Sequence, residues 1–306
     1  MTFVLKWAGP VGVRQWWVKR WRFREDLAKI AETYDPDAEF IPLFVQHLVG
    51  AGDGPSEVGY TNALGRSTYA SPNLQVLRDR VMPLLTWIHS VMPRITHLPL
   101  DYEGGVSYWQ FTPEQQEAAT RRSGVSKRKQ IIQHNRSAST WKRLVLTATE
   151  SMVHEVWGDD VEFSNYLMLP TDHYGTLHDH NGWPVTADND DTLGLVAYLR
   201  TGGNRFRGYD REVQWSRMTA DFVAQVERAK IRGHKVVVWL SPPGWTGDAL
   251  DKRADPRAVP FWKVLVRAIL EHGPDTVVMW GTSKLWAEHP SFEPAAIKVF
   301  SEFGLP

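Results

Sequence analysis

Two carboxylates, Asp101 and Glu103, stand one residue apart after a short apolar run and just before the pair Gly104-Gly105. Successive residues of a β-strand point to opposite faces, so Asp101 and Glu103 would share a face, about 6–7 Å apart. Because two nearby carboxylates resist being charged together, we expect one of them to keep its proton nearer to neutral pH. Paired carboxylates are common where glycosidic bonds are broken, so this pair indicates sugar chemistry.

Seven short apolar runs are predicted to be β-strands, and the carboxylate pair ends the third of them. Several runs are continuously apolar, as expected for strands covered on both faces of a parallel sheet. Helical patterns lie between them, and this alternation predicts a parallel α/β fold. The expected strands are residues 3–7, 40–47, 96–103, 162–169, 193–199, 235–240 and 276–280. The expected helices are residues 11–34, 72–91, 113–156, 218–232 and 259–272.

A TIM-like (β/α) barrel is the form of this fold that the candidate residues favour, because most of them lie where a predicted strand ends. Barrels carry their active residues at the carboxyl ends of the strands. An open doubly wound sheet is the alternative, although no Gly-rich phosphate fingerprint follows an early strand. With no long linker or break in composition, residues 1–306 are predicted to form a single domain.

The composition argues against several classes of protein. Lys+Arg and Asp+Glu are 35 each, so no global field draws the chain to nucleic acid or a membrane surface. No run of 18 apolar residues occurs, and we expect no membrane span. Cysteine is absent, which excludes disulfides and thiolate chemistry. The 15 tryptophans exceed ordinary usage, and because indole faces also stack on sugar rings, this excess favours a carbohydrate ligand.

Five short pieces of sequence occur in an order found in one enzyme family. They are Trp7 before a turn with proline, Asp101-Tyr102-Glu103, Tyr166 before a second turn with proline, Tyr198-Leu199-Arg200, and Trp280-Gly281. Over roughly residues 3–285 the chain therefore resembles the hyaluronidase family of glycoside hydrolases. The resemblance implies a distorted barrel with about seven strands.

The resemblance also implies a role for each matching residue. Glu103 would be the general acid that protonates the leaving glycosidic oxygen. Asp101 would orient the N-acetyl group of the substrate, whose carbonyl oxygen attacks the anomeric carbon, so that configuration is retained without an enzyme nucleophile. Tyr166 and Tyr198 would donate hydrogen bonds to the acetamido group or the leaving sugar. Trp280 would form an apolar wall under the reacting ring.

Two further tryptophans are candidates for sugar binding. Trp7, at the end of the first predicted strand, is assigned to the substrate by the resemblance. Trp245 follows the stiff turn Ser241-Pro242-Pro243-Gly244 and is either a platform for a sugar ring or a packed side chain.

Possible metal ligands are concentrated in one loop. His173, His178 and His180 with an aspartate are zinc-type ligands, but no His-Glu-x-x-His pattern supports them. A polar loop over the mouth of the barrel is the favoured interpretation. Residues 188–191 are acidic, yet lack the glycine and distant glutamate of an EF-hand loop. We therefore expect no metal and no cofactor.

Two basic segments have solvated or packed alternatives. Residues 16–24 combine tryptophan with arginine, and at helical spacing the aromatic residues are expected to pack while the arginines reach outward. Residues 121–129 carry five positive charges and no acid, which suits a phosphate backbone or an acidic polysaccharide. An exposed, solvated stretch is the favoured interpretation, and the balanced total charge argues against a nucleic-acid partner.

The expected function is a retaining glycosidase whose partner is a polysaccharide or oligosaccharide containing N-acetylhexosamine. A barrel that has lost catalysis and serves as a glycan-binding or structural component, for instance of a virion or cell surface, is the alternative. The glycines at 104–105 favour it, because an acidic-aromatic stretch follows in the family. A metal-dependent hydrolase using the loop at 171–180 is the third possibility. The first residues lack the charged region and cleavage site of a signal peptide, so we expect none. The sequence specifies no oligomeric state.

Overall fold

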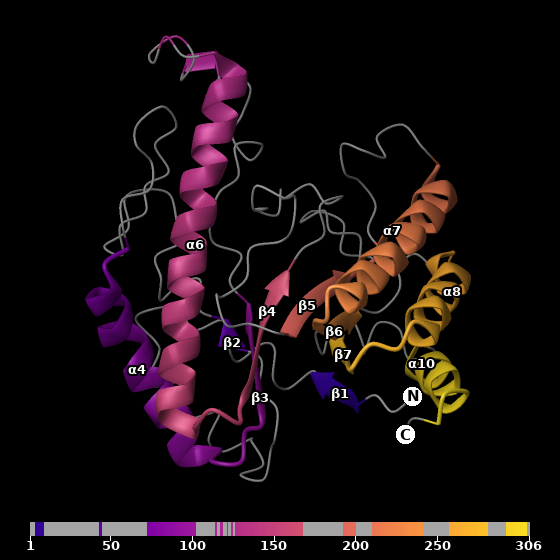
Figure 1. The fold of residues 1–306 in the computed structure, drawn as a ribbon. Helices are drawn as coiled ribbons and strands as arrows, with labels where there is room; N and C mark the ends of the chain where they lie inside the picture. The colour runs from indigo at the N-terminus through magenta and orange to yellow at the C-terminus, as the bar shows by residue number, and fades with distance from the viewer. Residues whose placement is uncertain are drawn as a thin grey trace. The chain divides into compact units, whose positions relative to one another are not determined.

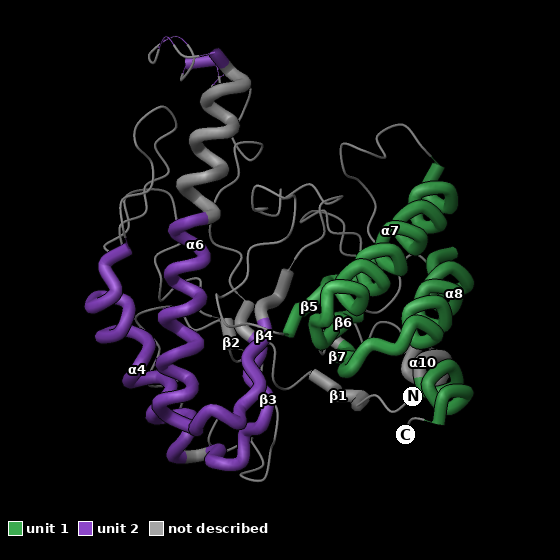
Figure 2. Tube along the Cα trace, in the orientation of Figure 1, with its two compact units in different colours: residues 1–17, 168–173, 191–306 green, residues 18–167, 174–190 purple. Residues whose placement is uncertain are grey.

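The structure is a computed structural model, and its described residues fall into two compact units. Unit 1 comprises residues 1–17, 168–173 and 191–306, and unit 2 comprises residues 18–167 and 174–190 (Figure 2). The residues that the structure describes are 4–8, 43–44, 72–101, 114, 117–118, 121, 124, 126–167, 192–199, 210–240, 257–280 and 292–304. The predicted helix at 11–34 lies outside them, and the single domain over residues 1–306 stays a prediction.

Unit 1 contains four parallel strands in the order β1-β7-β6-β5 (Figure 1). The strands are β1 (Val4–Ala8), β5 (Thr192–Ala197), β6 (Lys235–Leu240) and β7 (Thr276–Trp280). Its helices are α7 (Arg211–Ile231), α8 (Ala258–Glu271) and α10 (Phe292–Ser301). Helix α7 packs against β5, β6 and α8, and α8 packs against α10.

The strands of unit 1 form because their sequences are almost continuously apolar. In β6 every residue from Val236 to Leu240 is buried, and every residue of β5 is buried as well. Strands covered on both faces are typical of a parallel sheet with helical crossovers. Helix α8 buries Trp262, Leu265 and Ile269 at a spacing of three and four residues, which gives it one apolar face.

Unit 2 contains three parallel strands in the order β2-β3-β4, with two long helices (Figure 1). The strands are β2 (Leu43–Phe44), β3 (His97–Asp101) and β4 (Glu162–Leu167). The helices are α4 (Leu74–Val91) and α6 (Lys127–Trp157), which pack against each other. Asn73 caps α4, since its side chain accepts a hydrogen bond from the backbone N–H of Val76.

The observed elements confirm the predicted alternation of strands and helices, and the fold class is α/β. The expected strands at 235–240 and 276–280 coincide with β6 and β7. The helix predicted over 113–156 is interrupted: residues 114, 117, 118 and 121 are helical, and α6 begins at Lys127, after Gly124 with a φ of 64° that favours glycine. Helix α7 begins at Arg211 rather than 218, because Asp210 caps it by accepting from the N–H of Glu212.

Helix α10 was not predicted. None of the helices among the described residues is both long enough and apolar enough to cross a membrane.

Candidate functional site

The carboxyl ends of β3 and β4 carry two of the predicted site residues in unit 2. Asp101 is the last residue of β3, and Tyr166 is the last but one of β4. The two strands pair in parallel with Leu100 opposite Asn165, so Asp101 and Tyr166 occupy the next positions on neighbouring strands. On its other side Asp101 is the register partner of Phe44 in β2. The backbone therefore brings Asp101 and Tyr166 to the same end of the same sheet.

The register also decides which positions of β3 and β4 belong to the same face. His97 is paired with Glu162, and Pro99 with Ser164. Because side chains alternate along a strand, positions 97, 99 and 101 of β3 share a face with positions 162, 164 and 166 of β4. Positions 101 and 166 are thus two residues beyond the pair Pro99 and Ser164 on this face.

A buried hydrogen bond crosses this face below the strand ends. Nε2 of His97 lies 2.9 Å from Oγ of Ser164, and His97 and Ser164 are 1% and 0% exposed. The donor and acceptor roles depend on the imidazole tautomer. In the same layer, Oε1 of Glu162 is buried and has no hydrogen-bond partner among the described residues. A polar layer therefore lies under Asp101 and Tyr166.

The sequence reasoning did not identify His97 and Ser164 as residues of interest. Each stands beside one apolar residue and one polar residue: His97 between Thr96 and Leu98, and Ser164 between Phe163 and Asn165. His97 and Asp101 are four residues apart in the same strand, and residues separated by an even number share a face. This spacing could have placed His97 on the face of the candidate site.

Other predicted site residues lie outside the described residues. They are Glu103, Trp245 and the histidines of the loop at 171–180. Elsewhere in the described part of the chain, no group of three or more His, Asp and Glu side chains is placed to hold a metal ion.

Unit 1 carries three predicted site residues at or next to strand ends. Tyr198 directly follows β5, and its side chain is buried, with 1% exposed. Trp280 is the last residue of β7 and is the register partner of Ala8. Trp7 is paired with Met279, so positions 7 and 280 fall on opposite faces of the β1–β7 pair. The sugar-binding roles of these three residues stay predictions.

Several tryptophans belong to the core. Trp141, Trp215, Trp239 and Trp262 are among the largest fully buried side chains, at 0–2% exposed. Trp262 also meets Phe300 edge-to-face, with 6.4 Å between ring centroids. For these four side chains the abundance of tryptophan is explained by packing rather than by a carbohydrate ligand.

Two surface carboxylates have a pKa that is clearly shifted. A hydrogen bond from Arg78 lowers the pKa of Glu155, and one from Arg267 lowers the pKa of Glu302. Both pairs join two elements within one unit and lie at the surface. They are structural ion pairs and are separate from the strand ends described above.

Comparison with known proteins leaves the family of the chain undetermined. No family model and no curated protein matches it. Among solved structures, 97% of the chain is similar to 91% of a dihydropteroate synthase from Coxiella burnetii in complex with pteroic acid, at 11% identity and a TM-score of 0.35. A beta-glycosidase is similar over 91% of this chain and 85% of its own, at 14% identity and a TM-score of 0.36. An endo-glycoceramidase II from Rhodococcus sp. is similar over 83% and 67%, at 11% identity and a TM-score of 0.33. All three scores are below 0.5, so none of these likenesses establishes a shared fold or activity.

Proposed function

We propose that this protein is a retaining glycoside hydrolase that cleaves a polysaccharide containing N-acetylhexosamine by substrate-assisted catalysis. The observation that carries the proposal is the register of β3 and β4, which places Asp101 next to Tyr166 at the carboxyl end of a parallel sheet. Active residues of parallel α/β proteins are found at this end of the strands. Glu103, the proposed general acid, follows Asp101 by two residues in the sequence.

The proposed reaction uses two groups of the chain and one of the substrate. Glu103 gives its proton to the glycosidic oxygen as the bond to the anomeric carbon breaks. The acetamido oxygen of the substrate forms a bond to that carbon, while the Asp101 carboxylate accepts a hydrogen bond from the acetamido N–H. Water then attacks the same carbon, the bond to the acetamido oxygen breaks, and Glu103 takes up the proton. Two displacements at one carbon retain its configuration.

Tyr166 would donate a hydrogen bond to the acetamido group beside Asp101. Tyr198 is assigned to the same task by the resemblance, and Trp7, Trp245 and Trp280 to the sugar rings. A hydroxyl placed at the site of developing charge stabilises the transition state more than the ground state, which is the condition for catalysis.

The fold that we propose for this function is a distorted barrel of about seven strands, related to the hyaluronidase family. Its support is the repeated unit of parallel strand and helix in both units, together with the candidate residues at strand ends.

The test is the release of reducing ends from hyaluronan, chondroitin and chito-oligosaccharides across pH 4–7, comparing the wild type with Glu103→Gln. The variant keeps the size of the side chain and removes the acid. We expect kcat to fall by a factor of at least ~100 because protonation of the leaving group is lost. Glu117→Gln is the matched control, since Glu117 is an exposed carboxylate paired with Arg121 on the surface. It should leave kcat within about twofold.

The alternative, a barrel that binds glycans without cleaving them, is supported by the glycines at 104–105. A wild type that releases no reducing ends from any of the three polymers would contradict the hydrolase on these substrates. Retention of the protein on an intact polymer in that case would support the binding function.

A further inference from the structure

The buried pair His97 and Ser164 is not used by the proposed reaction, yet it lies on the same face as the proposed site. Its members are bonded across β3 and β4 and are both buried, next to the buried residues Leu98 and Phe163. Taking a hydroxyl and an imidazole out of water is costly, and the hydrogen bond between them offsets only part of that cost. An apolar pair of similar size would fill the same space without this desolvation cost. A role besides packing is therefore expected.

The alternation of side chains along β3 and β4 leaves their register incompletely specified. A slip of one residue would turn every side chain to the other face, and burial prevents it. A slip of two residues keeps each side chain on its own face, so alternation does not exclude it. The hydrogen bond opposes the two-residue slip that carries Ser164 away from His97, because His97 is paired with Glu162 and already reaches two positions further along β4, to Ser164.

Attachment of β3 on its β2 side is weakened by a proline. The N–H of Glu162 donates to the carbonyl of Thr96, at 2.8 Å. The backbone N–H and C=O groups of Thr96 and of every second residue after it therefore face β4. Pro99 belongs to the alternate set, which faces β2, and proline has no N–H to donate. The described residues of β2 are only Leu43 and Phe44. Among the described residues, β3 is therefore attached mainly through its pairing with β4.

We propose that the His97–Ser164 hydrogen bond locks the register of β3 against β4 and so holds Asp101 beside Tyr166. His97 and Ser164 are then positioning residues, and their effect on catalysis rests on the proposed function. A slip of two residues would move Asp101 by about 6–7 Å along β4. Displacements as small as 1 Å can cost on the order of 100-fold in rate.

The test compares His97→Leu and Ser164→Ala, which break the bond, with His97→Gln, whose side-chain amide keeps a nitrogen near the position of Nε2. Thr149→Val is the matched control. Thr149 is fully buried in α6 of the same unit and donates to the carbonyl of Val145 at 2.8 Å, within its own helix. His97→Leu, Ser164→Ala and Thr149→Val each remove a buried hydrogen bond. Only the first two remove one that joins β3 to β4.

Hydrogen–deuterium exchange of the amides of residues 98, 100 and 101 in β3 and 163–166 in β4 is the readout that does not need activity. We expect faster exchange there in His97→Leu and Ser164→Ala, restoration in His97→Gln, and no local change in Thr149→Val. Reducing-end release is the second readout. We expect kcat to fall ~10–100-fold in the first two variants and to stay within about threefold in His97→Gln and Thr149→Val.

Equal exchange and equal kcat in His97→Leu and Thr149→Val would overturn the proposal, as would faster exchange spread evenly over unit 2. If His97→Leu does not fold, Ser164→Ala, which removes one oxygen atom, gives the same comparison. A wild type without glycosidase activity but with the predicted exchange pattern would reject the proposed function and leave the register lock standing.

Discussion

The strands of unit 1 and those of unit 2 treat buried polar groups differently. Among the described strand residues of unit 1, the buried polar side chains are Thr192 and Thr276, each at the first position of its strand. In unit 2, His97 and Ser164 are bonded to each other across β3 and β4, below the strand ends that carry the proposed site. The buried polar side chains of the described strands thus lie at strand starts in unit 1. In unit 2 they join one strand to its neighbour, on the face of the proposed site.

The largest effect is expected at a large, fully buried side chain of the core. Trp262→Ala in α8 removes a fully buried indole that meets Phe300, and should lower the free energy of unfolding by about 3–5 kcal/mol. Val264→Ala on the same helix is the control, because Val264 is 58% exposed and should change it by less than about 0.5 kcal/mol. Urea denaturation measures both. Equal losses in the two variants would show that unit 1 is not packed as described.

A double-mutant cycle sharpens the comparison in unit 2. His97→Leu and Ser164→Ala should each cost about 1–3 kcal/mol, because each leaves a buried partner without its bond. The double variant should cost less than the sum, with a coupling of about 0.5–3 kcal/mol. His97→Leu combined with Thr149→Val should be additive, since Thr149 bonds within its own helix. Additivity in both cycles would show that the pair contributes no interaction of its own.

A smaller effect is expected at the start of α7, which packs on β5 and β6. Asp210→Ala removes the side chain that accepts from the N–H of Glu212 at 2.9 Å, and should cost about 1 kcal/mol. Asp210→Asn keeps a side-chain acceptor at the cap and should cost less. Thermal unfolding of the two variants measures the difference. An Asn variant as unstable as the Ala variant would contradict a capping role for Asp210.

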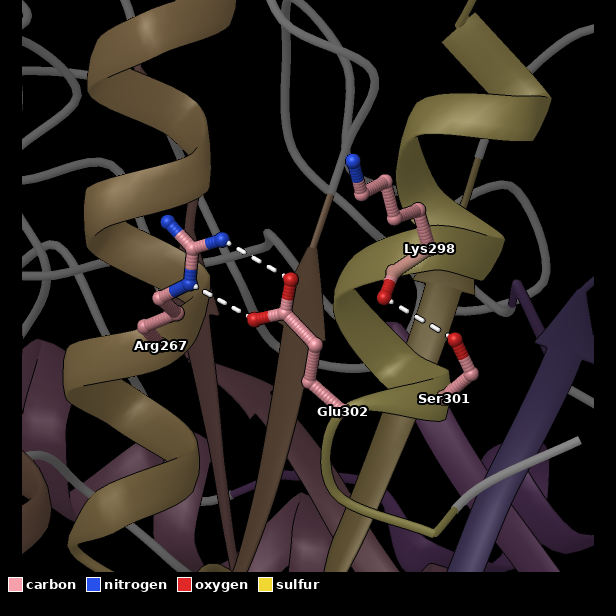
Figure 3. A network of polar contacts seen from close by, with 4 residues as sticks. All are labelled: Arg267, Lys298, Ser301 and Glu302. Carbon is pink, nitrogen blue, oxygen red and sulfur yellow. Dashed lines mark hydrogen bonds and ion pairs between the residues drawn. The ribbon is translucent and has the colours of Figure 1, made fainter.

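The smallest effect is expected at the surface ion pair between α8 and the end of α10. Arg267 donates to both carboxylate oxygens of Glu302, at 3.0 and 3.1 Å, and this lowers the pKa of Glu302 (Figure 3). A carboxyl group with a lower pKa in the folded than in the unfolded chain stabilises the fold above its ordinary pKa of 4.5. That stabilisation is lost as the pH falls through the lowered value.

Glu302→Gln should therefore lower Tm by about 1 °C at pH 7, and the difference should shrink as the pH falls below 4.5 and Glu302 takes up a proton. Arg267→Gln is the companion variant and should show the same dependence on pH. A difference that does not shrink as the pH falls would mean that packing of Glu302, rather than its charge, is responsible.

Much of the fold was predictable because its signals are local. The apolar runs at 235–240 and 276–280 mark β6 and β7 without reference to any partner segment. The start of α7 was predicted too late, because its first turn is polar and only the cap at Asp210 marks it. The break before α6 was not predicted, because the helical pattern continues across Gly124, whose positive φ lies outside the helical region.

The candidate site was predictable only in part. Asp101 and Tyr166 were chosen from the sequence, and the register of β3 and β4 places them on neighbouring strands. His97 and Ser164 were missed, because each is unremarkable alone and they become a pair only in the folded chain. Tyr198 was chosen for its hydroxyl, but its burial to 1% exposed is a property of the packed unit.

The sequence by itself determined the order of strands and helices, because apolar periodicity and helix caps act over a few neighbouring residues. It also determined which residue types stand at strand ends, and hence the sugar chemistry that we propose. Only the tertiary structure decided the register between β3 and β4. Alternation repeats every two residues and does not distinguish shifts of two, whereas the hydrogen bond between His97 and Ser164, 67 positions apart, opposes the shift that would separate them.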